Sequence, residues 1–421
     1  MTRVASSQPH LLHLTLAFPP DGVSTATMQG GIARGLAARG FAVTVITTTP
    51  HYNRDPSAEL DQPMRPVFLR LVYRSDYGGC VVYHIRVREK GRRILRRVFD
   101  YAVFHTVSLA IALTRREHFD VIVAASPPLT IGIAAALVAA ARRIPFVYNV
   151  QEIYPDVAID LGVLRNRALI AIARRMEMFI YRRAQVLVTI SERFRDRIIA
   201  KRVPPAKVLI IPNFANTSDI APGPKDNAFA VRHGLVGKFV VLYAGNLGLT
   251  QDFDTVIAAA EGVPDDVVFL MVGGGSRAAW LEGEIRRHNS PSLRMLPYQD
   301  SNHLPDLYAT SSVGLVTLIK DADRGTFPSK VYTIMSSGRP CVVVSDLASD
   351  AAELVGRTRS GAAVAPGDAI GLRRLIMDLR DHPGTAEEMG GRGRQFVVAT
   401  HSPDAVVSQY DELLRGLVSR S

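Results

Sequence analysis

Short apolar runs alternate with longer amphipathic stretches along nearly the whole chain. In the first half, runs rich in Val, Ile and Leu predict strands buried on both faces, at 11–17, 42–48, 81–87, 120–126, 146–151, 185–191 and 208–213. Between them, helical spacing of the apolar residues predicts helices over 25–39, 92–116, 130–142, 164–183 and 192–200. This alternation is typical of a parallel, doubly wound sheet.

The second half repeats the pattern. It predicts strands at 239–245, 267–273, 293–297, 313–318, 341–345 and 362–365. It also predicts helices over 252–261, 277–288, 303–310, 329–337, 349–355, 369–381 and 403–418.

A cluster of Pro, Asn and Gly interrupts the periodicity between the halves and predicts an interdomain linker. We therefore expect an α/β protein of two Rossmann-like, doubly wound parallel-sheet domains facing each other across a cleft. The expected parts are an N-terminal Rossmann-like domain (1–214), a linker (215–236), a second Rossmann-like domain (237–400) and a C-terminal helix (401–421) that could pack back on the N-terminal domain.

Amino-acid composition indicates the size of the core and the cellular compartment of the protein, but it does not indicate which reaction, if any, the protein catalyses. The 421 residues are 47% apolar, which leaves ample core for two domains. The two cysteines, Cys80 and Cys341, match no metal spacing or disulfide framework, which favours a reducing cytoplasm. The apolar stretches 99–113 and 121–141 are too short, or broken by Pro127-Pro128, to predict a transmembrane helix.

Positive charge is concentrated in the first half. Residues 1–202 hold 29 Lys and Arg against 15 Asp and Glu, whereas the remainder holds 21 against 24. The densest basic run is Arg86, Arg88, Lys90, Arg92, Arg93, Arg96 and Arg97, which leads into Phe99, Tyr101 and Phe104. A basic stretch followed by an aromatic amphipathic helix predicts contact with an anionic membrane surface. A solvated helix face is the plainer interpretation, and no nucleic-acid-recognition motif is present.

The loops that follow strands are the places to seek chemistry, because ligands of open parallel sheets bind at the strands' carboxyl ends. The loop Gly325-Thr326-Phe327-Pro328-Ser329-Lys330 precedes a predicted helix. Unpaired backbone N–H groups at a helix start suit an anion, and Lys330 adds a full positive charge. An ordinary loop with a surface lysine is the alternative.

Two loops of the first half carry further candidates. Gly22 would let backbone approach a ligand closely, and Ser24 or Thr25 would cap the following helix. Glu152 and Asp156 flank Tyr154 after a predicted strand and could orient a hydroxyl or transfer a proton. Both carboxylates could instead cap the next helix; Asp156 is the preferred functional candidate.

Two glycine turns follow strands of the second half, at 245–248 and 273–277. Neither has the spacing of a dinucleotide fingerprint or of a GxxxxGK[ST] phosphate loop. Asp321 and Asp323 lack further oxygen ligands nearby in sequence, so we expect a solvated loop there and no metal site.

The order and spacing of these segments resemble a known family. The matching segments are Phe18-Pro19-Pro20-Asp21-Gly22, Pro50-His51-Tyr52, Ala125-Ser126-Pro127-Pro128, Gln151-Glu152-Ile153-Tyr154-Pro155-Asp156, Ile211-Pro212-Asn213, Tyr243-Ala244-Gly245-Asn246-Leu247-Gly248, Pro328-Ser329-Lys330 and Ser336-Ser337-Gly338-Arg339-Pro340. Nearly the whole chain resembles the GT-B glycosyltransferases of retaining family 4, especially bacterial surface-polysaccharide enzymes similar to the fucosamine transferases.

The resemblance implies a nucleotide-diphosphate sugar held by the second domain and an acceptor held by the first, with no metal or other cofactor required. It implies donor contacts from Gly245, Asn246, Leu247, Gly274, Arg277, Gly325, Thr326, Phe327, Pro328, Ser329, Lys330 and Thr333. It implies acceptor contacts from Gly22, Ser24, His51 and Tyr154. Asp156, Glu152 and Lys330 are the candidate catalytic residues, and charge on the leaving phosphate would be stabilised by Lys330.

The chain departs from the family pattern at the donor side. Many relatives have glutamates where this sequence has Gly325 and Thr333, and an arginine where it has Asn246. Many relatives also have a histidine at the position of Gln151.

The expected activity is transfer of a sugar to a polyprenyl-diphosphate-linked or other glycan, by a cytoplasmic enzyme bound to the inner face of the plasma membrane. Nucleic acid is not an expected partner. The alternatives are a sugar-nucleotide epimerase or hydrolase of the same fold, a non-catalytic sensor and a nucleic-acid-binding protein.

Overall fold

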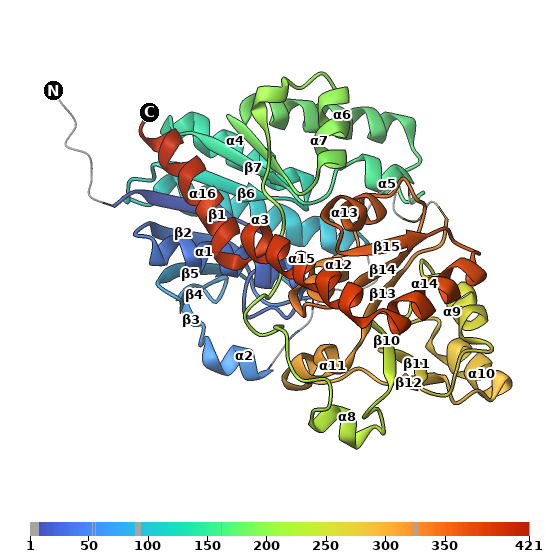
Figure 1. The fold of residues 1–421 in the computed structure, drawn as a ribbon. Helices are drawn as coiled ribbons and strands as arrows, with labels where there is room; N and C mark the ends of the chain where they lie inside the picture. Colours follow the sequence, from blue (N-terminus) through green and yellow to red (C-terminus); the bar gives the residue numbers. More distant parts are fainter. Residues whose placement is uncertain are drawn as a thin grey trace. The chain divides into compact units, whose positions relative to one another are not determined.

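The computed structural model describes residues 8–52, 54, 56–88, 94–160, 162–320, 322 and 327–420. The chain divides into two compact units: unit 1 comprises residues 1–214 and 403–421, and unit 2 comprises 215–402. Each unit has one central β-sheet with helices on both faces (Figure 1). The predicted α/β architecture with two doubly wound sheets is confirmed.

The sheet of unit 1 has strand order β3-β4-β5-β2-β1-β6-β7-β8-β9. Its strands are β1 (His10–Leu14), β2 (Ala42–Thr48), β3 (Arg65–Phe68), β4 (Val72–Tyr77), β5 (Cys80–Ile85), β6 (Val121–Ala125), β7 (Phe146–Val150), β8 (Val186–Thr189) and β9 (Val208–Ile210). Strand β4 pairs antiparallel with both β3 and β5, and the other described strand pairs of this sheet are parallel. The sequence pattern missed β3 and β4 because β3 is an exposed edge strand and β4 carries polar residues.

The helices of unit 1 are α1 (Ser24–Ala38), α2 (Pro56–Asp61), α3 (Ile94–Thr114), α4 (Leu129–Arg142), α5 (Asp156–Asp160), α6 (Arg167–Arg183), α7 (Glu192–Ala200) and α16 (Pro403–Val418), with a 3-10 turn at Pro205–Lys207. Helix α4 packs between α3 and α6 on one face of the sheet. Helix α16 packs on α1, where a Cβ at Gly35 would lie 2.5 Å from Val407 Cγ2. Asn149 Nδ2 also donates to Tyr410 Oη at 2.9 Å, which ties α16 to β7.

The sheet of unit 2 is entirely parallel, with strand order β12-β11-β10-β13-β14-β15. Its strands are β10 (Phe239–Ala244), β11 (Val267–Val272), β12 (Leu293–Leu296), β13 (Val313–Thr317), β14 (Cys341–Val344) and β15 (Gly361–Val364). Its helices are α8 (Ala228–Arg232), α9 (Phe253–Ala260), α10 (Ala278–His288), α11 (Leu304–Thr310), α12 (Lys330–Ser336), α13 (Asp350–Thr358), α14 (Ala369–Asp381) and α15 (Pro383–His401), with a 3-10 turn at Ser301–His303. All six strands match the sequence prediction.

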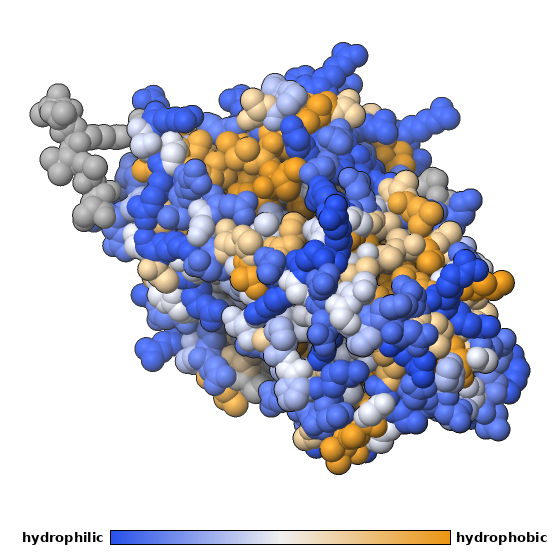
Figure 2. Space-filling view, viewed as in Figure 1, coloured by the Kyte–Doolittle hydropathy of each residue, from blue (hydrophilic) through white to orange (hydrophobic). Residues whose placement is uncertain are grey.

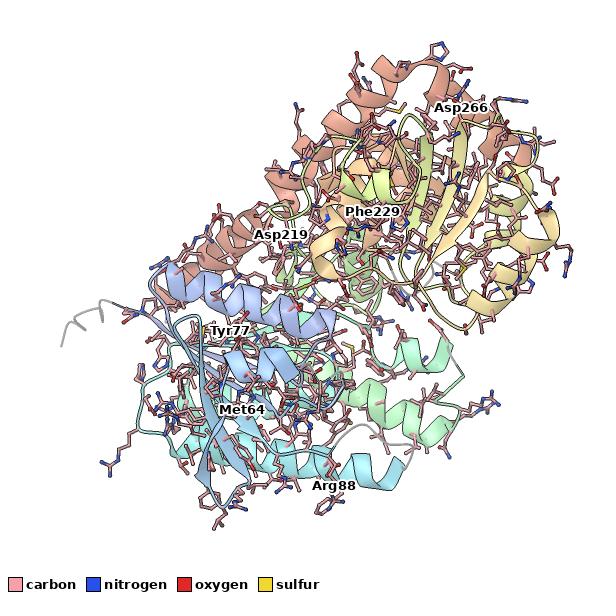
Figure 3. All side chains as sticks on the ribbon, turned by 90° about the horizontal axis from the view of Figure 1, so that it is seen from below. Met64, Tyr77, Arg88, Asp219, Phe229 and Asp266 are labelled. Atoms are coloured by element: carbon pink, nitrogen blue, oxygen red, sulfur yellow. The ribbon has the colours of Figure 1, made fainter. Side chains whose placement is uncertain are left out.

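The segment expected as a linker contributes to the core of unit 2. It contains helix α8, whose Phe229 is 2% exposed, and it supplies Ala215, Ile220 and Leu235 to the same core cluster. Figure 3 shows Phe229 within the body of this unit, whereas Asp266 lies at its rim. The helix α15 was not predicted, because its glycines and polar residues hide the apolar pattern. One of them is required: a Cβ at Gly390 would lie 2.0 Å from Gly338 O.

Candidate active site

A half-buried lysine lies at the carboxyl end of β10. Lys330 Nζ donates a hydrogen bond of 2.8 Å to Tyr243 Oη and lies 4.3 Å from the centroid of that ring. Tyr243 Oη in turn donates to Asn246 O at 2.6 Å. Burial lowers the pKa of Lys330 to about 8 and raises that of Tyr243. Among the described residues no carboxylate pairs with Lys330, so its charge is available to an anion.

Two glycine-containing loops pack backbone to backbone beside this lysine. Leu247 N donates to Gly274 O and Arg277 N donates to Leu247 O, both at 2.9 Å. Gly273 has φ +149°, and a Cβ there would lie 1.9 Å from Gly245 O. A Cβ at Gly245, where φ is +134°, would lie 2.9 Å from Lys330 Cε. Glycine is required at both positions, because only glycine combines this backbone conformation with this approach.

The remaining donor-side candidates differ in their surroundings, and some of them lie outside the described residues. The Arg277 guanidinium stacks on Trp280 at 3.6 Å and pairs with the exposed Asp254 at 3.3 Å. Phe327 stacks on Tyr332 with 4.9 Å between ring centroids, which anchors Pro328 and the exposed Ser329 at the start of α12. Thr333 is half-buried within α12. Gly325, Thr326, Asp321 and Asp323 lie outside the described residues.

Unit 1 has a cavity of about 640 Å³ at the carboxyl ends of β1, β6 and β7. Its polar lining consists of Thr15, Thr25, Tyr52, Tyr101, Thr130, Glu152 and Tyr154. The Tyr52 and Tyr101 hydroxyls lie 3.4 Å apart, and Thr130 Oγ1 lies 2.7 Å from His105 Nε2. The remaining walls are apolar, including Pro127, Pro128 and Leu129. Such a mixture of apolar walls and convergent hydroxyls suits a sugar or a similar polyol.

The two candidate carboxylates have different surroundings. Glu152 lines the cavity, and burial raises its pKa while a hydrogen bond from Tyr154 opposes the shift. Asp156 instead pairs with Lys201 Nζ at 2.8 Å, and Lys201 also pairs with the buried Glu177. This ion-pair network joins α5, α6 and α7, so Asp156 has a structural task and Glu152 has the better placement for an acceptor.

The other acceptor-side candidates gather near the start of α1. Asp21 Oδ2 accepts hydrogen bonds from the backbone N–H groups of His51 and Tyr52, at 3.0 and 3.1 Å. The His51 and Tyr52 rings lie 4.2 Å apart, which connects His51 to the cavity wall. The expected helix cap was wrong. The N-cap of α1 is Val23, which makes no side-chain cap, and Ser24 and Gly22 are exposed.

Sequence reasoning missed Tyr243 and, apart from Tyr154, the hydroxyls that line the cavity. Tyr243 lies within a buried strand, where an aromatic residue indicates core, and only its hydrogen bond to Lys330 assigns it to the site. Within the described parts of the chain, no group of three His, Cys, Asp or Glu is placed to hold a metal ion. None of the described helices is both long and apolar enough to cross a membrane. Cys80 and Cys341 are free and buried.

Comparison with known families accounts for both units. Residues 22–213 match the family described as Glycosyl transferase 4-like domain, and residues 226–396 match Glycosyl transferases group 1. The chain is a GT-B glycosyltransferase of family 4. This glycosyltransferase is 24% identical over 414 residues to the colanic acid biosynthesis glycosyl transferase WcaI of Escherichia coli K12, covering 95% of this chain and 98% of WcaI. It is also 24% identical to the glycosyltransferase WbjE of Pseudomonas aeruginosa, covering 79% and 84%.

A solved relative shares the fold of this glycosyltransferase. The crystal structure of Anabaena HepE in complex with UDP aligns with a TM-score of 0.70 at 16% identity, covering 97% of this chain and 100% of HepE. The same protein in complex with UDP-glucose gives a TM-score of 0.66 at 17% identity, again covering 97% and 100%. The GT-B fold predicted from the sequence is thereby confirmed.

Proposed function

We propose that this glycosyltransferase moves a sugar from a nucleotide-diphosphate sugar to a polyprenyl-diphosphate-linked or other glycan acceptor in surface-polysaccharide synthesis, with retention of the anomeric configuration. The observation that carries the proposal is Lys330, a half-buried cation at the carboxyl end of β10 with no carboxylate partner among the described residues. The relative WcaI, which is named for colanic acid biosynthesis, supports the polysaccharide setting.

The donor is assigned to unit 2. Its diphosphate would lie against Lys330 and the loop Gly245–Leu247, where Arg277 adds a second cation. As the bond between sugar and phosphate breaks, negative charge grows on the leaving diphosphate, and a cation already desolvated beside it lowers the barrier. The binding of UDP and UDP-glucose by HepE supports a nucleotide-sugar donor. Gly325 and Thr333, in place of the family's glutamates, leave the sugar to be recognised by other groups.

The acceptor is assigned to the cavity of unit 1. Glu152 and the hydroxyls of Tyr52, Tyr101 and Thr130 would orient the glycan. Ser126 Oγ accepts the backbone N–H of Gln151 at 3.0 Å and so fixes the loop that carries Glu152. Because burial raises the pKa of Glu152, its carboxylate accepts a proton more readily than an exposed one would.

The enzyme is further proposed to bind the inner face of the plasma membrane through unit 1. Lys90, Arg92 and Arg93 lie outside the described residues, and the side chains of Arg96 and Arg97 are not described either. The described parts offer another basic and apolar face, on α6. Its exposed residues include Leu169, Ile172 and Phe179 together with Arg175, Arg182 and Arg183. Figure 2 shows apolar side chains interrupted by strongly polar ones over the part of unit 1 that holds α4 and α6. Such a face suits anionic headgroups.

The decisive experiment combines donor binding with transfer. Thermal unfolding is first followed with UDP-, GDP-, dTDP- and ADP-sugars, and one nucleotide class is expected to raise the midpoint. That donor is then incubated with polyprenyl-diphosphate-linked glycan, and the anomeric configuration of the product is read by NMR. Acceptor-independent turnover would indicate an epimerase or hydrolase. Binding without turnover would indicate a sensor, and salt-sensitive duplex binding without donor binding would indicate a nucleic-acid-binding protein.

A further inference from the structure

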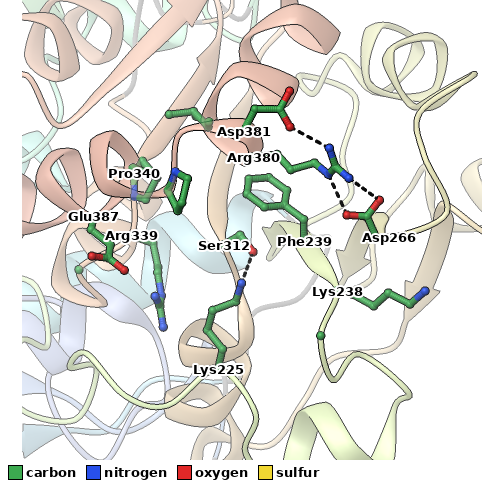
Figure 4. A pocket seen from close by; sticks show the side chains of 15 residues that line it. Lys225, Lys238, Phe239, Asp266, Ser312, Arg339, Pro340, Arg380, Asp381 and Glu387 are labelled. Atoms are coloured by element: carbon green, nitrogen blue, oxygen red, sulfur yellow. Dashed lines mark hydrogen bonds and ion pairs between the residues drawn. The ribbon is translucent and has the colours of Figure 1, made fainter.

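A second pocket of unit 2 lies at the opposite end of the sheet from Lys330. Phe239, the first residue of β10, forms part of its wall, and so do Arg339 and Pro340, which immediately precede β14 (Figure 4). Its volume is about 520 Å³, within the range of small-molecule sites. Because Lys330 lies beside Tyr243 and Gly245 at the carboxyl end of β10, this pocket is separate from the proposed donor site.

The first notable group in the pocket is Lys225. Its Nζ donates to Ser312 Oγ at 2.7 Å and lies 5.8 Å from the centroid of the Phe239 ring. Burial lowers the pKa of Lys225 and the nearby positive charge of Arg339 lowers it further, whereas the carboxylate of Asp226 opposes the shift through space. One hydroxyl partner leaves two of the three ammonium N–H donors available.

The second group is Arg339. One of its terminal nitrogens donates to Gly223 O at 3.0 Å and to Ala309 O at 2.6 Å. The Nε atom is buried and has no acceptor within the described part of the chain. Burial lowers the pKa of Arg339, and the exposed Glu387 opposes this shift only through space, without an ion pair. A buried donor without an acceptor is costly.

The basic side chains that line the pocket differ in whether they pair with a carboxylate. Arg380 is bound by Asp266 at 2.8 and 3.0 Å and by Asp381 at 2.8 Å (Figure 4). Lys225 and Arg339, in contrast, have only neutral hydrogen-bond acceptors in the described structure. Two like charges held close together in a partly desolvated place repel one another, and a bound anion would offset that cost.

We propose that this pocket binds a small phosphorylated ligand, with its phosphate between Lys225 and Arg339 and an apolar or ring-shaped part against Phe239 and Pro340. The phosphate oxygens would accept the remaining ammonium N–H groups of Lys225 and the free guanidinium N–H groups of Arg339. Arg–phosphate contacts are strong and directional, whereas Lys225 supplies a point charge. The proposal does not depend on the identity of the donor sugar.

The test uses phenyl phosphate and inorganic phosphate as probes, titrated into the full chain at constant ionic strength and followed by calorimetry. Phenyl phosphate is expected to bind more tightly, because its ring adds contact with Phe239. Lys225→Met should weaken phenyl phosphate binding at least about tenfold, as expected for loss of a charged contact. Lys225→Arg should retain binding. Lys238→Met is the matched control, because Lys238 also lines the pocket but donates to Asp265 O.

Lys330→Met separates this pocket from the donor site. Phenyl phosphate binding that survives Lys330→Met and fails in Lys225→Met supports the proposal. Equal affinity of Lys225→Met and the unmodified chain, or loss of binding only in Lys330→Met, overturns it. Urea unfolding checks that each variant is folded. If Lys225→Met is not folded, Lys225→Gln removes the charge but keeps a polar side chain, so the same comparison can be made.

Discussion

Lys330 Nζ donates to Tyr243 Oη at 2.8 Å, and this hydroxyl donates onward to the carbonyl of Asn246. The lysine is therefore fixed to the loop that follows β10 before any substrate arrives. A cation held in this way needs little reorganisation when a diphosphate binds, which is the property expected of a site that stabilises a leaving group. Its desolvation is a cost to folding, because burial disfavours the charged form.

Replacing Lys330 with Met should separate stability from function. The pKa of Lys330 is lowered from 10.5 to about 8, which corresponds to roughly 3 kcal/mol of unfavourable burial at neutral pH. We expect the variant to resist urea better than the unmodified chain and to bind nucleotide sugar at least about tenfold more weakly. Lys320→Met, which changes an exposed lysine, is the control. Unchanged donor affinity in Lys330→Met would remove this residue from the site.

Donor affinity should also depend on pH in a defined direction. Lys330 is charged below its pKa of about 8 and becomes neutral above it. Donor binding should thus be full at pH 7 and weaken toward pH 9, by as much as about tenfold per pH unit. Folding stability should change oppositely: between pH 8 and 10.5 the unfolded chain binds the extra proton, so this contribution to stability rises with pH. Calorimetry on the unmodified chain and on Lys330→Met checks both, since the variant should show neither dependence.

The sequence could predict the strands whose residues are nearly all buried, because such strands are almost unbroken apolar runs. Strands β10, β11, β13 and β14 of unit 2 are buried almost along their whole length, so each is an almost unbroken apolar run. The edge strands β12 and β15 are only half-buried, but they are short apolar segments between helices and were predicted as well. Strand β3 is exposed along its length and left no such run. Gly245 and Lys330 could be placed together because loops after parallel strands meet at one sheet edge. Asp156 could not be separated from Glu152, because its ion pair with Lys201 depends on packing between α5 and α7.

The two carboxylates should respond differently to loss of charge. Glu152→Gln removes a half-buried carboxylate from the acceptor cavity, so transfer should fall about tenfold or more while donor affinity and the urea midpoint change little. Asp156→Asn removes one of the two carboxylates that pair with Lys201, so the urea midpoint should fall. Steady-state kinetics and urea unfolding on both variants make the comparison. A stable Asp156→Asn variant with impaired transfer would instead return Asp156 to the catalytic candidates.

Unit 1 should lose stability on acidification. Burial lowers the pKa of His13 and His84 to about 4, whereas the unfolded chain binds their protons near pH 6.5. Stability should therefore be full above pH 6.5 and fall as the pH drops toward 4, by up to roughly 3 kcal/mol for each histidine. His84 is held neutral between Ser75 Oγ and Thr48 O. His84→Gln should flatten the pH dependence of urea unfolding between pH 7.5 and 5, and an unchanged slope would contradict the assignment.

The face of α6 gives the membrane proposal its sharpest test. Ile172 is 51% exposed and Phe179 is 38% exposed, and both lie among the arginines of this helix. Insertion of these side chains and attraction of Arg175, Arg182 and Arg183 to anionic lipid act together, so loss of either part should weaken binding. Ile172→Ser with Phe179→Ser should reduce cosedimentation with phosphatidylglycerol vesicles several-fold at low salt. Triple substitution of those arginines by Gln should have a similar effect.

The matched control for these variants is Ile370→Ser in unit 2. Ile370 is 71% exposed on α14, so the substitution removes the same kind of side chain from a helix of unit 2, where Arg373 and Arg374 are its neighbours. Its vesicle binding should equal that of the unmodified chain. Nucleotide-sugar affinity should be unchanged in every α6 variant, because the donor is assigned to unit 2. Equal vesicle binding by the α6 variants and the Ile370→Ser control would exclude α6 as the membrane contact, whereas loss confined to the α6 variants would place the acceptor cavity in a unit that is itself bound to lipid.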